Sequence, residues 1–266
     1  MHILHVLQMP MCEDDWLKIS NDFTARCNFP HCIGALDGKH ISILPPPNSG
    51  SLYYNYKRFF SLVLLALVDS YCRFIYVDIG AYGRTSDGGV YNNSSLAAAV
   101  ENGELHLPPS STIPGTDRDM PYVMVGDDAF ALKPYLLKPY ALRNLTEQQR
   151  IFNYRLSRAR RTAENAFGQL SQRFRVFGRP IPLMPEKVET VVMAACCLHN
   201  FLLRDAASQA VYMPNEKTTA TTMKSMPRQG SNRSSQVAQD VRNLFCQYFN
   251  SPAGELRGQK QRSLEL

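Results

Sequence analysis

Tryptophan is almost absent from this chain, whose 266 residues include only Trp16. Sugar-binding sites commonly stack tryptophan on the sugar ring, so this scarcity argues against a glycosidase built on a carboxylate pair. Long apolar runs are also missing. None approaches the roughly 20 residues that a membrane helix needs, and we expect no membrane partner. The first residues lack the basic leader and small-residue cleavage site of a secretory signal.

Paired cysteines are missing as well. The seven cysteines are an odd number, and none falls in a Cys-x-x-Cys pair. This pattern favours reduced, buried thiols in an intracellular protein over a disulfide framework. Cys196, Cys197 and His199 could suggest a zinc site, but they lie in an apolar helical stretch without a second ligand pair, so we interpret them as core residues.

Positive charge is concentrated in one segment. The chain carries a net charge of +6, yet residues 143–179 alone hold nine arginines, no lysine and two acids, a net charge of +7. Guanidinium groups match phosphate oxygens in a bidentate way, so the segment favours a phosphate-bearing partner. A solvated helix face is the alternative explanation of such a run.

Hydrophobic patterning predicts an α/β protein with a mixed sheet flanked by helices. Three strands follow a first helix, and then come a helix ending near residue 102, a short strand, a long helix that begins at Thr146 and a further buried helix. The predicted ranges are 13–26 for the first helix, 32–44, 59–68 and 73–79 for the strands, 122–125 for the short strand and 187–203 for the last helix. This element order is that of the ribonuclease H-like fold.

Four acids fall at informative places in this scheme. Asp37 lies in the first strand, Asp87 in the glycine-punctuated loop before a helix, Asp127 at the end of the short strand, and Glu164 beside the apolar face of the long helix. Carboxylates converging on one spot repel each other unless cations lie between them, and Mg²⁺ or Mn²⁺ prefers such oxygen ligands. Two such ions can activate a water and stabilise the leaving oxygen in phosphodiester hydrolysis. Taken singly, each acid favours a structural role over a catalytic one, and Asp87 could be a helix N-cap.

Several stretches together resemble the nuclease domain of Harbinger-type transposases and the DDE superfamily nucleases derived from them. They are 28–41, Gly83–Gly89, Val125–Asp127, Leu156–Gly168, Cys197–Phe201 and Tyr248–Asn250. The resemblance implies that Asp37, Asp127 and Glu164 are catalytic and that they bind the metal together with Asp87. Phe130 departs from the family, which commonly has tyrosine there.

The resemblance and the composition also predict an organisation and a setting. We expect a residual helical segment at 1–30, the nuclease domain at 31–205, a flexible linker at 206–236, and a helix with a polar tail at 237–266. Related proteins usually carry a helical DNA-binding region before the nuclease domain, so targeting is expected to be missing or supplied by a separate DNA-binding partner protein. The expected location is the nucleus, with the cytoplasm as a further one.

The predicted function is therefore a divalent-metal-dependent DNA endonuclease. Its expected DNA-binding residues are Arg158, Arg160, Arg161, Arg173 and Arg175. The alternative is a catalytically silent DNA- or chromatin-binding adaptor that retains the fold. Four intact, mutually repelling carboxylates argue against the adaptor.

Overall fold

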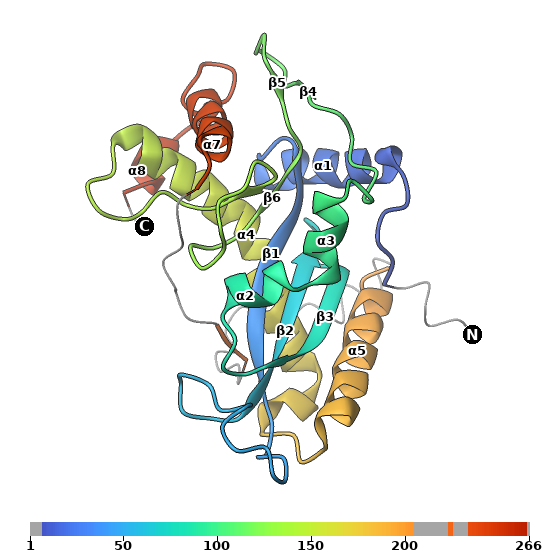
Figure 1. Ribbon diagram of the computed structural model, residues 1–266. Helices are drawn as coiled ribbons and strands as arrows, with labels where there is room; N and C mark the ends of the chain where they lie inside the picture. The colour runs from blue at the N-terminus through green and yellow to red at the C-terminus, as the bar shows by residue number, and fades with distance from the viewer. Residues whose placement is uncertain (1–6, 205–222, 226–233, 265–266) are drawn as a thin grey trace.

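The centre of the molecule is a sheet whose first three strands form an antiparallel meander (Figure 1). The computed structural model describes residues 7–204, 223–225 and 234–264. Strand β1 (Cys32–Ser42) pairs with β2 (Ser61–Val68), and β2 pairs with β3 (Phe74–Tyr82). Every residue of β2 is buried, because helices cover both faces of the sheet and a continuous apolar run suits such a strand.

Two short parallel strands complete the main path of the sheet. Strand β6 (Val123–Val125) runs parallel to β1, and β7 (Leu136–Leu137) runs parallel to β6. The resulting order is β3-β2-β1-β6-β7. The predicted α/β, ribonuclease H-like architecture with a mixed sheet is confirmed. Strand β7 was not predicted, because two residues between prolines carry no periodicity.

Helices cover both faces of this sheet. On one side lies the long helix α4 (Glu147–Arg173) with α5 (Pro185–Leu202), and on the other lie α2 (Asp87–Asn92) and α3 (Ser95–Glu101) (Figure 1). Helix α4 begins as predicted at Thr146, whose hydroxyl accepts from the Gln149 amide in a capping box. The single helix expected before residue 103 is two helices, because the Ser94 hydroxyl caps the second one.

The first and last helices belong to the same core. Helix α1 (Glu13–Cys27) ends near Phe29, whose ring centroid lies 5.7 Å from that of Phe245 and 4.9 Å from that of Phe249 in α7 (Gln236–Phe249). Helix α8 (Gln259–Arg262) follows beside the amino-terminal half of α4 (Figure 1). The carboxy-terminal helix α7 therefore packs on the domain that contains the sheet.

The remaining short elements lie at the margins. They are a small hairpin, β4 (Ser111–Thr112) with β5 (Asp119–Met120), the 3₁₀ helix η2 (Arg175–Gly178), and β8 (Lys224–Ser225), which pairs with β1 at Lys39 and His40. Most of the predicted linker, 206–236, lies outside the described residues.

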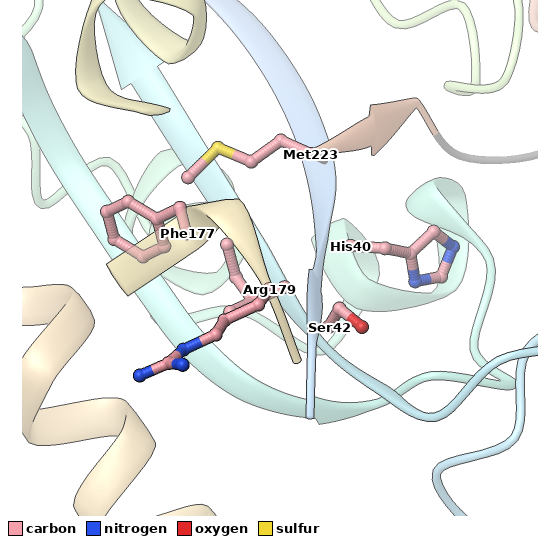
Figure 2. A pocket seen from close by; sticks show the side chains of 6 residues that line it. His40, Ser42, Phe177, Arg179 and Met223 are labelled. Carbon is pink, nitrogen blue, oxygen red and sulfur yellow. The ribbon is translucent and has the colours of Figure 1, made fainter. Parts of the chain in front are cut away.

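A small pocket lies where β8 meets β1. Figure 2 shows Met223 and Phe177 on one side of β1, while the His40 ring points away from them. The pocket is lined by His40, Ile41, Ser42, Phe177, Arg179 and Met223, and so contains none of the predicted acids. Within the described ranges, no helix is long and apolar enough to cross a membrane.

The segment first considered for zinc instead holds the edge strand β3. The buried His199 ring is hydrogen-bonded through Nε2 to the Cys72 carbonyl oxygen at 2.7 Å. Asn200 accepts from the Phe74 amide at 2.8 Å and donates to the Phe74 carbonyl oxygen at 2.7 Å. His199 and Asn200 are therefore core residues that replace a missing neighbour strand.

Asn200→Ala is expected to lower the free energy of unfolding by about 2–4 kcal/mol, because both backbone groups of Phe74 would lose their buried partner. Urea denaturation measures this. Asn102→Ala is the matched control, since Asn102 is exposed and should change stability by less than about 0.5 kcal/mol. A loss of similar size in both variants would contradict this role.

Candidate active site

Strand pairing brings Asp37 and Asp127 together. Ala35 of β1 lies opposite Val125 of β6 in a parallel pair, and each aspartate follows two residues later. Side chains two residues apart in extended chain share a face, so both carboxylates lie toward α4 at neighbouring positions. In the structure Asp37 lies within β1 and Asp127 lies just after β6.

The two carboxylates differ in environment. The side chain of Asp37 is buried, and its Oδ1 accepts from the Gly38 amide at 3.0 Å. Asp127 is half-buried, and its Oδ1 accepts from the Ala129 amide at 3.0 Å. Burial, reinforced by repulsion from Asp37, raises the pKa of Asp127 to about 6. Asp127 therefore holds a proton more readily than an ordinary aspartate.

Lys39 is part of this site and was missed in the sequence. Its Nζ lies 2.9 Å from Oδ2 of Asp37 and 5.6 Å from the centroid of the Phe167 ring on α4. The side chain is buried, so the ion pair is shielded from solvent. Its position two residues after Asp37 in a strand was a usable signal, because alternate residues share a face.

Glu164 lies on α4 and forms an ion pair with an arginine of the same helix. Its Oε1 lies 2.8 Å from an Nη of Arg160, one turn earlier on the helix, and its side chain is 44% exposed. The positive charge of Arg160 also opposes the rise in the pKa of Asp127. Beside Glu164, a methyl group added at Gly168 would meet no atom within 4 Å, so there is open space on this face. The positive charge of Arg160 thus acts on both Glu164 and Asp127.

Asp87 is the first residue of α2, which Ser86 caps by accepting from the Gly89 amide at 3.3 Å. The start of α2 lies against the loop after β6, since a methyl group added at Gly88 would lie 3.0 Å from the Ala129 carbonyl oxygen. The backbone of Asp87 is therefore close to the Asp127 loop. Its side chain lies outside the described part of the structure, so its role as a metal ligand stays a prediction.

The carboxylate oxygens of these acids are the kind of ligand that a hard divalent cation prefers. Oδ2 of Asp37 is a buried carboxylate oxygen paired with the Lys39 ammonium, and Asp127 repels Asp37 across adjacent strands. Two carboxylates that repel each other favour a cation with oxygen ligands. Among the described side chains, no three acids, histidines or cysteines lie close enough together to hold a metal as they stand. Glu164 would complete the set only after leaving Arg160.

The five predicted DNA-binding arginines do not share one surface. Arg160 and Arg161 lie beside Glu164, and Arg161 is exposed. Arg158 lies elsewhere on the helix surface, near the Tyr154 ring at 6.0 Å. Arg173 and Arg175 are exposed at the far end of the helix. They lie roughly 20 Å from Arg160, because an α-helix rises about 1.5 Å per residue. The structure brings Arg160 and Arg161 to the carboxylates and leaves the other three apart from them.

Comparison with known proteins identifies the family to which the chain belongs. Residues 36–200, more than half of the chain, match the family described as DDE superfamily endonuclease. The chain belongs to this family. The matched range contains all four predicted acids, and the resemblance to Harbinger-derived nucleases is confirmed.

Curated relatives of this DDE superfamily member come from plants and animals. The chain is 30% identical over 205 residues to "Protein ALP1-like" of Arabidopsis thaliana, covering 75% of this chain and 49% of the relative. It is 27% identical over 217 residues to "Putative nuclease HARBI1" of Rattus norvegicus, covering 79% of this chain and 58% of the relative. The chain thus spans about half the length of the curated relatives it matches. No solved structure matches it.

Proposed function

We propose that this DDE superfamily member is a divalent-metal-dependent DNA endonuclease that hydrolyses phosphodiester bonds. The observation that supports this most is the placement of Asp37 and Asp127 side by side on β1 and β6, under the helix that carries Glu164. Asp37, Asp127 and Glu164 would hold Mg²⁺ or Mn²⁺, with Asp87 as a further ligand. The metal would supply Lewis-acid activation of a water and of the phosphodiester.

The residues of the chain supply binding and charge balance around that centre. Asp37 keeps one oxygen on the Gly38 amide, so the carboxylate is held in one orientation. Arg160 and Arg161 would bind the anionic backbone of the substrate. Release of Glu164 from Arg160 would free both the carboxylate for the metal and the guanidinium for phosphate.

Cleavage of supercoiled plasmid tests the proposal. The purified protein should nick DNA in Mg²⁺ or Mn²⁺ and stop in excess EDTA, and Glu164→Gln should lower the rate by about 10³-fold or more, since it removes a predicted ligand. Glu147→Gln is the matched control, because Glu147 lies on the same helix in an ion pair with Lys260. Cleavage that persists in EDTA, or that Glu164→Gln leaves unchanged, would contradict the proposal.

The adaptor is a second candidate, supported by one observation. Glu164 is engaged by Arg160, and the described side chains form no ready metal site. An adaptor would bind DNA fully in EDTA and would cut no substrate in any divalent metal. For either candidate, we propose that DNA is the partner and that a separate DNA-binding protein supplies targeting. We also propose that the protein acts in the nucleus, and imaging of a fluorescent fusion would test this location.

A further inference from the structure

Lys39 places a positive charge on one of the two carboxylate oxygens of Asp37. Its Nζ lies 2.9 Å from Oδ2, while Oδ1 accepts from the Gly38 amide at 3.0 Å. The exposed fractions of the Lys39 and Asp37 side chains are only 9% and 4%. Because solvent ions screen buried charges weakly, the charge of Lys39 acts strongly on everything that binds beside Asp37.

The fold holds Lys39 in this position. Lys39 lies opposite Leu64 of β2 in the antiparallel register, and its Nζ lies 5.6 Å from the centroid of the Phe167 ring on α4. Moving the ammonium out to solvent would leave the carboxylate of Asp37 buried without its partner, which is strongly unfavourable. Lys39 is therefore a fixed part of the carboxylate site.

The position of Lys39 limits what Asp37 can bind. In a centre of two metal ions about 3.5–4 Å apart, a carboxylate commonly bridges the ions by giving one oxygen to each. Mg²⁺ on Oδ2 of Asp37 would lie within about 5 Å of the ammonium, since a magnesium–oxygen distance is about 2.1 Å. A divalent ion and an ammonium repel each other strongly at that separation in a buried site. Oδ1 has a second lone pair and can still bind one ion.

The other described acids offer ligands for one ion. Asp127 forms no ion pair among the described residues, and its Oδ1 accepts from the Ala129 amide. Glu164 is paired with Arg160 at 2.8 Å. Asp127 and Oδ1 of Asp37, on adjacent strands, can therefore share one ion, and release of Glu164 would add a third ligand to the same ion.

The charges around the centre also match one ion. The nearby Asp128 and Lys138 carry opposite charges and cancel each other. If Asp87 is counted as the predicted fourth acid, four carboxylates and two cations leave a net charge of −2. One divalent ion neutralises this charge, whereas two would leave the centre positive before a substrate binds. The side chains counted are those of Asp37, Asp87, Asp127, Glu164, Lys39 and Arg160.

We propose that Lys39 takes the place of a second metal ion, so that the centre holds one divalent ion. This inference rests on the proposed function, and it replaces the pair of ions considered from the sequence. Lys39 would supply the fixed positive charge that a second ion would otherwise supply beside the phosphodiester. The proton stays on Nζ, since only the charge is used.

The number of Mn²⁺ ions bound per chain at saturation, measured by equilibrium dialysis, tests this inference. Native protein should bind one ion. Lys39→Met should bind two, because it removes the repelling charge and frees Oδ2 of Asp37. Lys39→Arg keeps the charge and should bind one. Lys133→Met is the matched control and should also bind one, since Lys133 forms a partly exposed ion pair with Glu101.

Electron paramagnetic resonance gives a second readout, which a merely structural role of Lys39 would not change. Two Mn²⁺ ions about 3.5–4 Å apart are magnetically coupled, whereas one bound ion gives the signal of an isolated ion. The coupled signal should be absent from native protein and present in Lys39→Met. It should disappear again when Asp37→Asn is added to Lys39→Met.

A coupled pair of ions in the native protein would overturn this inference and leave the proposed endonuclease standing. One isolated ion in a folded Lys39→Met protein would overturn it as well, because Lys39 would then not limit the number of ions. The native protein and Lys39→Arg decide the count even if Lys39→Met does not fold. A native protein that binds no Mn²⁺ would contradict both the inference and the proposed function.

Discussion

Asp127→Asn is expected to lower DNA cleavage by about 10³-fold or more and, in metal-free protein at pH 7, to raise the free energy of unfolding by about 1–3 kcal/mol. Cleavage falls because the amide is a poor metal ligand. Stability rises because burial and the neighbouring Asp37 make the charged carboxylate unfavourable, which is why the pKa of Asp127 is raised to about 6. The amide can still accept from the Ala129 amide.

The pH dependence of this gain has a definite sign. The pKa of Asp127 lies near 6 in the folded chain and near the ordinary value of 3.8 in the unfolded chain. Between these values the folded chain binds more protons, so its stability falls as pH rises through this window. The advantage of Asp127→Asn should be complete above about pH 6 and vanish below about pH 4.

Urea denaturation in EDTA at pH 4 and pH 7, with plasmid cleavage in Mn²⁺, measures both effects. Asp128→Asn is the matched control, because Asp128 is the adjacent acid and is not a predicted ligand. It should keep cleavage within about tenfold of native and show no comparable gain in stability. A destabilised but active Asp127→Asn protein would contradict this description of the site.

Arg155→Met is expected to lower the free energy of unfolding by about 3–5 kcal/mol. The guanidinium donates to the carbonyl oxygens of Asn28 and Gly254 and to the Gln259 side chain, and lies over the Phe249 ring. One buried side chain thus joins α4 to the end of α1 and to the carboxy-terminal helices. Its removal would leave several buried acceptors without a donor.

Denaturation by urea measures the change, with Arg161→Met as the matched control. Arg161 is exposed on the same helix, so its replacement should leave stability within about 0.5 kcal/mol of native. Arg161→Met should instead weaken DNA binding in EDTA. An Arg155→Met protein as stable as native would mean that the carboxy-terminal helices dock without this link.

The elements with clear periodicity were predictable from the sequence. The continuous apolar run of β2 reflects burial on both faces, and the helical spacing of apolar residues in α4 reflects burial on one face. Strand β7 was not predictable, because a strand of two residues depends on pairing with its neighbour and is too short to show a hydrophobic pattern. The break between α2 and α3 depends on one capping serine, Ser94, within an otherwise helical stretch.

The site was predictable to the extent that it depends on strand register. Asp37 and Asp127 follow paired residues of adjacent strands, and Lys39 could have been added by the same argument. The contact of Arg242 with Pro139 could not, because packing brings together two segments about a hundred residues apart. The nine arginines counted in residues 143–179 include Arg155, which was not a predicted DNA-binding residue and which the fold buries.

Calorimetric titration with Mn²⁺ tests the central claim that Asp37, Asp127 and Glu164 form one divalent-metal site. Native protein should bind Mn²⁺ at pH 7 and bind it more weakly at pH 5.5, where protons compete for Asp127. Asp37→Asn, Asp127→Asn and Glu164→Gln should each weaken binding by about tenfold or more, and Asp128→Asn should not. Native protein that takes up no Mn²⁺, or that binds it equally well after Glu164→Gln, would contradict the claim.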